Sequence, residues 1–453
     1  MVSYPVLPPR LSSHNYYNDF ELRLSSLGPF ENKPHLAVAV SGGIDSLCLA
    51  LLADSWAVRR GGRVTALSVD HGLRESSREE LDQVSRWLQP RGIDHHILTW
   101  KGSKPTSGLQ ATARNARYNL MSNWCWNANI LHLLVAHTLD DQAETFLLRL
   151  KKGSGAEGLS AMSEIREISN VRLLRPLLGV RKTDLRKILE NQGQDWIEDP
   201  SNNDRAFERV RIRQNIHDGF FDAEALANLA NKFGQDRIAL ESSVCKLLAC
   251  STRIHPAGFA FLKLKKFDKP PKEIGVRALG RIISVIGGNN YSPSIEKMDR
   301  LYNELLENFS NNLGSFSRTL GGCRVIIEEK KYNGRVLICR EMRDLPKPLF
   351  AKNSNRIVWD QRFKIQFSPK IQNGTRIQAL GEKGWLKISS DSPILRVSNI
   401  PNQVMPTLPA LFNKDGVYFV PHLDYLRLDV PPAISSIQFY PPNSISREGF
   451  FLR

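Results

Sequence analysis

The feature that most constrains the fold is the six-residue loop Ser41-Gly42-Gly43-Ile44-Asp45-Ser46. The apolar stretch 35–40 before it has the character of a buried strand, and the run 47–52 after it resembles the buried side of a helix. A strand that leads through two glycines directly into a helix is typical of the first half of a βαβ unit. Two adjacent glycines there also indicate that a ligand approaches the backbone closely.

The same alternation of apolar strands and helical stretches continues through the first half of the chain. Further strands are predicted at 63–69, 95–100 and 131–136, and helices at 46–59, 76–88 and 107–127. Short strands with apolar runs, separated by helices, predict a parallel sheet that is covered on both faces. We therefore expect an α/β domain with a parallel sheet, Rossmann-like in architecture, over residues 1–216.

The pattern changes after about residue 199. Helices are predicted at 222–248 and 292–311, a hairpin is predicted from 324–328 and 335–338, and short β-like runs with many prolines follow from residue 356. A chain of 453 residues has room for two or three domains. We expect a mainly helical middle domain over 217–345 and a small β-rich domain over 346–453.

The glycine loop is suited to binding an anion. Gly42 and Gly43 can take positive φ and present consecutive N–H groups, and Ser41 and Ser46 add hydroxyl donors. Because the loop precedes a helix N-terminus at the carboxyl end of a strand, we predict a phosphate site formed by residues 41–46, Ile44 included. The lysine of a Walker A motif is missing, and the GxGxxG dinucleotide fingerprint is absent. Asp45 is unusual beside phosphate, unless it orients a donor or helps to hold Mg²⁺.

A second polar group follows the strand at 131–136. On a helix, His137, Asp141 and Glu144 would share one face, while the apolar face would carry Leu139, Ala143, Phe146 and Leu150 and pack on the sheet. The acids could hold Mg²⁺ or a cationic substrate, and His137 could bind phosphate or move a proton. The alternative is a capped amphipathic helix with solvated acids.

A third group lies in the stretch 195–216. Arg209 and Arg213 would share one helix face, and arginine suits phosphate recognition, although a solvated basic face is the alternative. The whole chain carries 62 Lys and Arg against 46 Asp and Glu, a net charge of +16. This excess favours a polyanionic partner, most often nucleic acid.

Composition argues against a secreted or membrane protein. No apolar run approaches the roughly 20 residues that cross a bilayer, and the N-terminal stretch is too polar for a signal peptide. We therefore expect a cytoplasmic protein. The six cysteines form no CxxC pair and no zinc-like cluster, so we expect reduced and mostly buried thiols.

With these residues in view, the loop resembles the PP-loop of the N-type ATP pyrophosphatases. That family binds the pyrophosphate of ATP in the loop and uses ATP to adenylate an oxygen. The fuller pattern resembles the tRNA(Ile)-lysidine synthetases over about the first 215 residues, and more weakly at RIVWDQRF and LPALFNKDGVYFVPHL. The stronger segments are SGGIDS, VDHGLRESS, ATARNARY, HTLDDQAETFLLRLKKGSG, LLRPLL and WIEDPSNNDRAFERVRIR. Val210 stands where the family usually has Asn, so we do not expect Val210 to be a ligand.

The resemblance implies a reaction. The wobble cytidine of an isoleucine tRNA with a CAU anticodon is adenylated by ATP at its C2 oxygen, with release of pyrophosphate. Free lysine then attacks C2, AMP leaves, and lysidine forms, which changes decoding from AUG to AUA and charging from methionine to isoleucine. A homodimer is compatible with the sequence.

The same resemblance suggests roles for individual residues. Asp45, His137, Asp141, Glu144 and Arg209 would serve catalysis, and Asp45 is a candidate Mg²⁺ ligand. Asp141 and Glu144 could bind lysine. The nucleotide or the tRNA backbone would be contacted by Arg114, Arg117, Arg209 and Arg213.

Three other functions fit parts of the pattern. A PP-loop tRNA thiolase would carry paired cysteines, whereas Cys125 stands alone. A GMP or NAD synthetase would not need so basic a chain. A tRNA-binding protein with a decayed nucleotide site would not need its loop and acids intact, and it would form no AMP.

Overall fold

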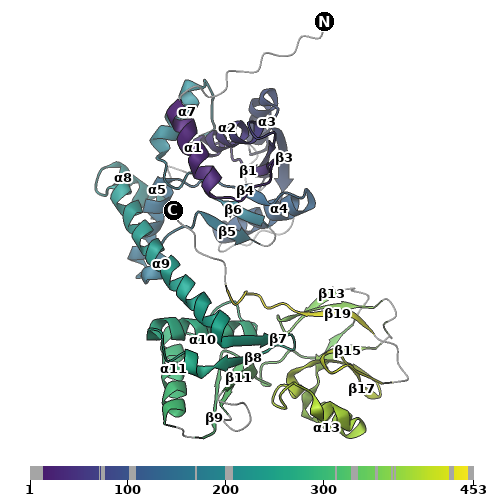
Figure 1. Cartoon of the computed structure of the whole chain (residues 1–453). Coiled ribbons are helices and arrows are strands. Elements are labelled where there is room, and N and C mark those ends of the chain that lie inside the picture. Colours follow the sequence, from purple (N-terminus) through teal and green to yellow (C-terminus); the bar gives the residue numbers. More distant parts are fainter. Residues whose placement is uncertain are drawn as a thin grey trace. The chain divides into compact units, whose positions relative to one another are not determined.

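A computed structural model describes residues 14–70, 72, 77–100, 109–168, 171–198, 208–311, 314–327, 335–351, 356–368, 371, 374–427 and 433–446. The chain divides into two compact units, Met1–Ala239 with Glu448–Arg453, and Leu240–Arg447 (Figure 1). Helix α9 (Ala223–Ser251) contributes residues to both units.

The first unit is built on a parallel sheet. Its described strands follow the order β3-β2-β1-β4-β6-β5, and every pairing is parallel except that of β5 with β6. All four predicted strands are therefore confirmed, with ends shifted by a residue or two. The bounds are β1 (His35–Ala39), β2 (Arg63–Asp70), β3 (Asp94–Thr99), β4 (His132–Leu134), β5 (Ile165–Ile168) and β6 (Val171–Leu174).

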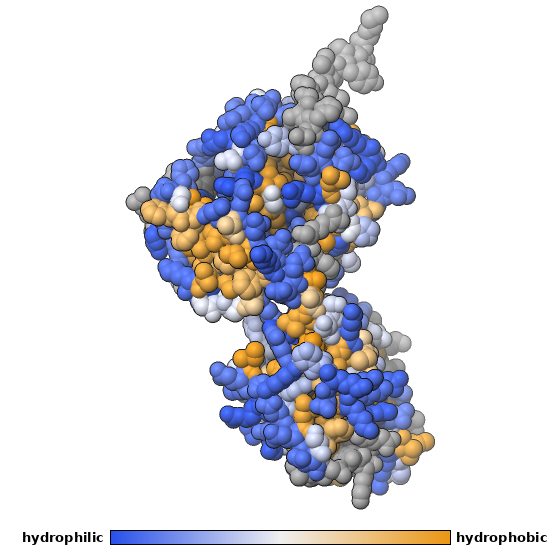
Figure 2. Space-filling view, turned by 60° about the vertical axis from the view of Figure 1, so that its left-hand side comes forward, coloured by the Kyte–Doolittle hydropathy of each residue, from blue (hydrophilic) through white to orange (hydrophobic). Residues whose placement is uncertain are grey.

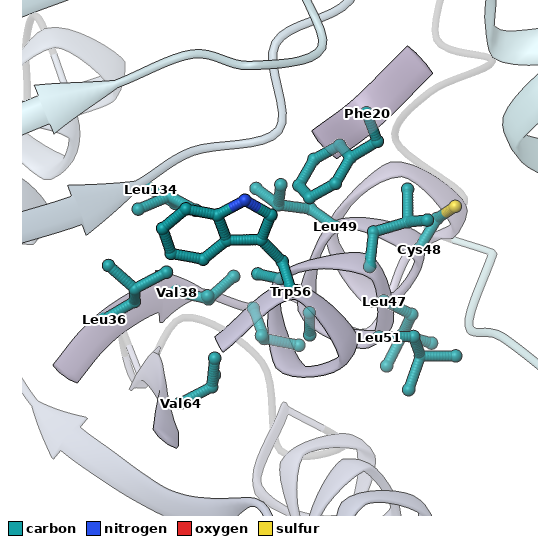
Figure 3. Packing of buried hydrophobic residues seen from close by; sticks show 14 of the residues in the cluster. Phe20, Leu36, Val38, Leu47, Cys48, Leu49, Leu51, Trp56, Val64 and Leu134 are labelled. Carbon is teal, nitrogen blue, oxygen red and sulfur yellow. The ribbon is translucent and has the colours of Figure 1, made fainter. Parts of the chain in front are cut away.

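Helices cover both faces of this sheet. One face packs against α1 (His14–Ser26), α2 (Ile44–Val58), α3 (Ser77–Leu88) and α7 (Lys182–Asn191), with Trp56 at the centre of the contact (Figure 3). The opposite face packs against α4 (Leu109–Asn127). Because neighbouring residues of β1 point to opposite faces, Leu36 and Val38 join the first cluster and Ala37 joins the second. The predicted doubly covered sheet is confirmed.

Helix α5 (Leu139–Lys151) corrects one expectation. Its buried residues Ala143 and Phe146 belong to a small cluster with α9, rather than packing on the sheet, and Leu150 is exposed. The predicted helical periodicity was right, but the surface that α5 covers comes from α9, which begins only at Ala223, long after α5 ends at Lys151. The short helix α6 (Ala156–Leu159) and the basic helix α8 (Glu208–His217) lie next to α5 in contact with it.

The second unit combines helices with antiparallel sheets. Helices α10 (Lys272–Gly287) and α11 (Ile295–Ser310) pack against a sheet of order β7-β8-β11-β10-β9, in which the predicted hairpin is β10 with β11. Beyond it lie sheets of order β12-β15-β16-β17-β18 and β13-β14-β19, and helix α13 (Gly381–Asp391), which the sequence analysis missed. The strand bounds are β7 (Thr252–His255), β8 (Phe259–Lys263), β9 (Phe316–Leu320), β10 (Cys323–Ile327), β11 (Arg335–Arg340), β12 (Leu349–Phe350), β13 (Arg356–Trp359), β14 (Phe363–Phe367), β15 (Arg376–Ala379), β16 (Pro409–Asn413), β17 (Gly416–Val420), β18 (Tyr425–Leu426) and β19 (Ile434–Phe439).

A buried charge cluster ties the parts of the second unit together. The Asp360 carboxylate accepts hydrogen bonds from Arg340 at 3.1 Å and from Arg362 at 2.7 Å, and all three side chains are buried. Arg362 also donates to the carbonyl oxygens of Gly258 and Ile286. The cluster therefore connects residues on both sides of position 345, where a domain boundary was predicted. The division into three domains stays a prediction beside the two units seen here.

Asp360→Ala should destabilise the second unit by about 3–5 kcal/mol, because two buried arginines would lose their shared counter-charge. Urea unfolding followed by circular dichroism measures this change. Asp424→Ala is the matched control, since Asp424 has the same left-handed φ of 50° but is exposed. An equal loss of stability in both variants would show that the backbone conformation, rather than the ion cluster, carries the effect.

On the face shown in Figure 2, hydrophilic residues dominate each unit and hydrophobic residues gather in smaller areas. Among the described residues, no helix has the length and apolar character needed to cross a membrane.

Candidate active site

The glycine loop joins β1 to α2 at the carboxyl end of the central strand. Gly42 has a φ of +85°, and a Cβ placed on it would lie 2.7 Å from Ile197 Cδ1 and 2.9 Å from Val84 Cγ2. The N–H of Ile197 also donates to the Gly42 carbonyl oxygen at 2.9 Å. Conformation and space therefore both require glycine at this position.

Gly43 behaves differently from the prediction. It is the N-cap of α2, with an extended φ of −77°, so the expected positive φ holds for Gly42 but is wrong for Gly43. A Cβ on Gly43 would meet its nearest neighbours at 3.8 Å and 3.9 Å, which is ordinary contact. The backbone at Gly43 is therefore open to approach, next to the unpaired N–H groups of a helix N-terminus.

The two serines of the loop have separate roles. Ser46 is buried, accepts a hydrogen bond from the Ser41 N–H at 3.1 Å, and donates to the Gly43 carbonyl oxygen at 3.0 Å. Ser41 is exposed, and its hydroxyl oxygen lies 3.3 Å from that of Ser46. Ser46 thus fixes the shape of the loop, while Ser41 presents its hydroxyl to an incoming group.

Asp45 forms an ion pair that the sequence analysis did not predict. Its Oδ2 lies 3.3 Å from Nζ of Lys182, the first residue of α7, whose backbone N–H donates to Asp140 Oδ2 at 2.8 Å. Burial raises the pKa of Asp45, and the Lys182 ammonium counteracts part of that rise. Oδ1 of Asp45 is buried without a hydrogen-bond partner among the described residues. This oxygen is available to a ligand.

Asp141 has a structural task as well as a place in the site. Its Oδ2 accepts the N–H of Thr138 at 2.9 Å, and the Thr138 hydroxyl accepts the N–H of Asp141, which forms a capping box at the start of α5. Burial would raise the pKa of Asp141, but the charge of Lys182, the hydrogen bond from the Thr138 N–H and further nearby charges together outweigh burial and lower the pKa. Asp141 therefore caps the helix, as the alternative interpretation proposed, but it is half-buried rather than a solvated acid.

Glu144 is almost fully buried and paired with the arginine helix. Nε of Arg213 donates to Glu144 Oε1 at 2.7 Å, and Nε of Arg209 lies 3.3 Å from Oε2. The hydrogen bond to Glu144 raises the pKa of Arg213. Arg209 and Arg213 do share one face of α8, as predicted, and that face contacts α5. Val210, between them, is buried, which fits the expectation that it is not a ligand.

His137 precedes α5 instead of lying on it, because the helix begins after the N-cap Thr138. Its Nδ1 accepts a hydrogen bond from Nε of the buried Arg175 at 3.3 Å. Burial and the charge of Arg175 lower the pKa of His137 to about 3. The imidazole is therefore neutral near pH 7, so it is a weak base there and can donate through Nε2.

Two more arginines gather beside Tyr118 on α4. The guanidinium carbons of Arg114 and Arg117 lie 5.3 Å and 5.4 Å from the centre of its ring. Burial lowers the pKa of Arg114, and the charges of Arg117 and Arg209 lower it further. Cations that repel one another are suited to binding a polyanion.

Two residues that contact this site, Lys182 and Arg175, were missed by the sequence analysis. Both lie in the segment 173–187, which carries the LLRPLL motif. The basic residues after this motif were visible, but nothing in their spacing shows which of them reaches the glycine loop.

The side chains of this site meet part of what a magnesium ion requires of its ligands. Mg²⁺ prefers oxygen ligands and often uses one or two carboxylates together with substrate phosphates. The partnerless Oδ1 of Asp45 meets this requirement, whereas the described residues include no cluster of three metal-ligating side chains.

Comparison with known proteins places this site in a family. A family model described as a PP-loop domain matches residues 16–219. The tRNA(Ile)-lysidine synthase of Orientia tsutsugamushi is 31% identical over 89% of this chain and 92% of its own length. That of a Wolbachia from Brugia malayi is 35% identical over 91% and 93%. The chain belongs to the tRNA(Ile)-lysidine synthase family. The predicted PP-loop fold, the use of ATP and the assignment as a tRNA-modifying ligase are thereby confirmed.

Among solved structures, the U34-tRNA thiolase NcsA of Methanococcus maripaludis with its [4Fe-4S] cluster matches 49% of this chain and 80% of its own length. Its sequence identity is 16% and its TM-score is 0.41.

Proposed function

We propose that the protein joins free lysine to C2 of the wobble cytidine of an isoleucine tRNA with a CAU anticodon. The C2 oxygen attacks the α-phosphorus of ATP and pyrophosphate leaves. The lysine side-chain amine then attacks C2, the C2–O bond breaks, and AMP carries the oxygen away. The product reads AUA instead of AUG and accepts isoleucine. The proposal rests on one observation in a chain of this family: Asp45 of the PP-loop pairs with Lys182, which also interacts with the acidic helix α5.

The first step needs stabilisation of the leaving pyrophosphate. The open backbone at Gly43, the Ser41 hydroxyl and the α2 N-terminus provide donors for it. Lys182 adds a positive charge: burial would lower its pKa, but Asp141 and Asp45 outweigh this and raise it. Mg²⁺ held by Asp45 would neutralise phosphate charge when bound.

For the second step, we propose that Asp141 and Glu144 bind the lysine. Both carboxylates are matched by cations of the chain here: Lys182 lies beside Asp141, and Arg213 binds Glu144. A lysine ammonium would therefore exchange with one of these cations rather than enter an empty acidic site. The amine must also lose a proton, and the pKa of about 3 makes His137 a weak base for that task.

For the tRNA, we propose that Arg114, Arg117, Arg209 and Arg213 contact phosphates near the reacting nucleotide. The second unit offers a further surface, the cation face, defined as Arg253, Lys263 and Arg335. Lys263 and Arg335 are direct cross-strand partners on β8 and β11, and Arg253 pairs with Phe261 on the same face. Like charges placed opposite each other destabilise a sheet, and an RNA backbone would compensate them.

The sequence around the cation face contains many basic residues and almost no acidic ones. Residues 246–269 hold six Lys and Arg and a single acid, Asp268. A shallow hollow of about 110 Å³ is lined by the three cations, Phe261 and the end of α9. Among the described residues, no acid pairs with any of the three cations, so the charge is available to phosphate.

Replacing all three cations of the cation face by glutamine should raise the KM for tRNA about 10–100-fold and leave kcat and the KM for ATP unchanged. The slope of log K for tRNA binding against log[salt] should become less steep by about 2–3, because each lost cation removes one phosphate contact. Filter binding at several salt concentrations measures this slope. Arg318→Gln is the control, because Arg318 is paired with Glu304. An unchanged slope would exclude this surface from tRNA binding.

The proposed reaction is tested by incubating the protein with ATP, labelled lysine and the isoleucine tRNA, and analysing the nucleosides by mass spectrometry. We expect lysidine and AMP only when all three substrates are present. AMP without lysine incorporation, or equal activity on a methionine tRNA with the same anticodon, would overturn the proposal. A thiolase is disfavoured, because burial raises the pKa of the Cys125 thiol to about 12. A homodimer and a cytoplasmic location stay predictions.

A further inference from the structure

Three polar side chains of the first unit form a chain of hydrogen bonds that the proposed chemistry does not use. Oγ of Ser85 on α3 lies 2.6 Å from Nδ1 of His95, the second residue of β3. Nε2 of His95 lies 2.7 Å from Oγ of Ser68 on β2, and Ser68 donates to the carbonyl oxygen of Val40 at 2.7 Å. We call this chain the His95 relay.

The hydrogens of the relay can be placed by elimination. Ser68 uses its one hydroxyl hydrogen on Val40, so it must accept from His95 Nε2–H. A neutral imidazole has one N–H, so Nδ1 must accept, and its donor is Ser85, whose hydroxyl has a second and more distant acceptor in the Leu81 carbonyl oxygen at 3.2 Å. Burial lowers the pKa of His95 to about 4, which agrees with a neutral ring near pH 7. The relay therefore has one direction, from α3 to Val40.

The relay ends at the entrance to the phosphate loop. Val40 directly precedes Ser41, and its N–H already donates to the Leu67 carbonyl oxygen at 2.9 Å. The N–H of Val40 is held by Leu67 and its carbonyl oxygen by Ser68. The backbone that leads into the loop therefore cannot rotate freely at Val40. Val84, the neighbour of Ser85 on α3, is one of the two side chains that leave no room for a Cβ at Gly42. Two consecutive residues of α3, Val84 and Ser85, are thus linked to the start of the loop, at Gly42 and at Val40.

We propose that His95 is a positioning residue for ATP: through Ser68 and Val40 it holds the Ser41–Gly42 backbone in the orientation that receives the pyrophosphate. The inference depends on ATP binding in the loop and not on the identity of the amine or of the RNA. Loss of the His95 side chain would displace the N–H donors of the loop without removing any group that touches ATP. Displacements near 1 Å at such sites cost up to about 100-fold in rate.

The same sheet contains a matched control. Nε2 of His35, at the opposite end of β1, lies 2.9 Å from Oγ1 of Thr65 on β2. This is also a histidine–hydroxyl contact between the side chains of paired strands, but its strand end is remote from the loop. A purely structural role for such contacts predicts similar consequences at both positions.

The test compares His95→Ala with His35→Ala in the full-length protein. We expect His95→Ala to raise the KM for ATP, and the Kd for ATP by calorimetry, about 10-fold, and to leave the KM for tRNA within about 2-fold. His35→Ala should leave all three values within about 2-fold. His95→Asn, which can still donate and accept, should recover most of the ATP affinity.

Ser68→Ala keeps the imidazole and removes only the link to Val40, so it covers the case in which His95→Ala does not fold. It should raise the KM for ATP about as much as His95→Ala. Unchanged ATP affinity in a folded Ser68→Ala protein would overturn the proposal, and so would equal changes in His95→Ala and His35→Ala. Because ATP affinity is measured without lysine, failure here is distinguishable from failure of the proposed ligation.

Discussion

Asp45→Asn should abolish turnover, with kcat reduced about 1,000-fold or more, while tRNA affinity stays within about 2-fold. Asparagine has nearly the same shape but cannot pair with Lys182 or offer a charged ligand to Mg²⁺ through Oδ1. Losses of this size are typical when charge stabilisation of a leaving group is removed. AMP release by chromatography and tRNA binding by filter assay measure the two quantities separately.

The same substitution should not destabilise the protein. Because the pKa of Asp45 is raised in the folded chain, the ionised form costs free energy of folding at pH 7. A neutral asparagine removes this cost, so the melting temperature should stay constant or increase. Loss of activity together with unchanged or higher stability is the mark of a residue kept for function.

Asp54→Asn, on the same helix α2 but away from the loop, is the control and should retain wild-type activity. Lys182→Met should also lower kcat strongly, since it removes the other half of the pair. AMP release by Asp45→Asn at a near wild-type rate would show that Asp45 does not act on the pyrophosphate.

The sheet could be predicted because its central strands β1 and β2 are largely buried and mostly apolar. The stretches 35–40 and 63–69 needed no partner to be recognised as strands. Helix α5 shows the limit of this reasoning: its apolar stripe showed that one face is covered, but not that α9 covers it. Likewise, Asp360 gave no sign that it binds two arginines, because Arg340 reaches it from β11, 20 positions earlier in the chain.

The part of the site that is formed by residues close together in the sequence could be predicted. The loop 41–46 is one continuous motif, so its ligand class followed from the chain alone. Lys182 could not be found in this way, because it lies 137 positions after Asp45 and reaches it only through the packing of α7 on α2. The conformation of Gly43 was also missed, since its N-cap role depends on exactly where α2 begins.

Glu144→Gln should weaken both the fold and the use of lysine. Its carboxylate joins α5 to α8 through Arg213 and Arg209, and removing the charge leaves two cations without their partner. Because both arginines are partly exposed, we expect a loss of only about 1–3 kcal/mol in unfolding free energy. The proposed role in lysine binding also predicts a KM for lysine at least 10-fold higher.

Arg213→Met separates these two roles. It breaks the same contact between α5 and α8, so its loss of stability in urea unfolding should match that of Glu144→Gln. It leaves the Glu144 carboxylate in place with one competing cation fewer, so the KM for lysine should stay constant or fall. Steady-state kinetics with lysine as the varied substrate measures the difference. A similar increase of this KM in both variants would mean that Glu144 only anchors the arginine helix, and the lysine site would then have to lie elsewhere.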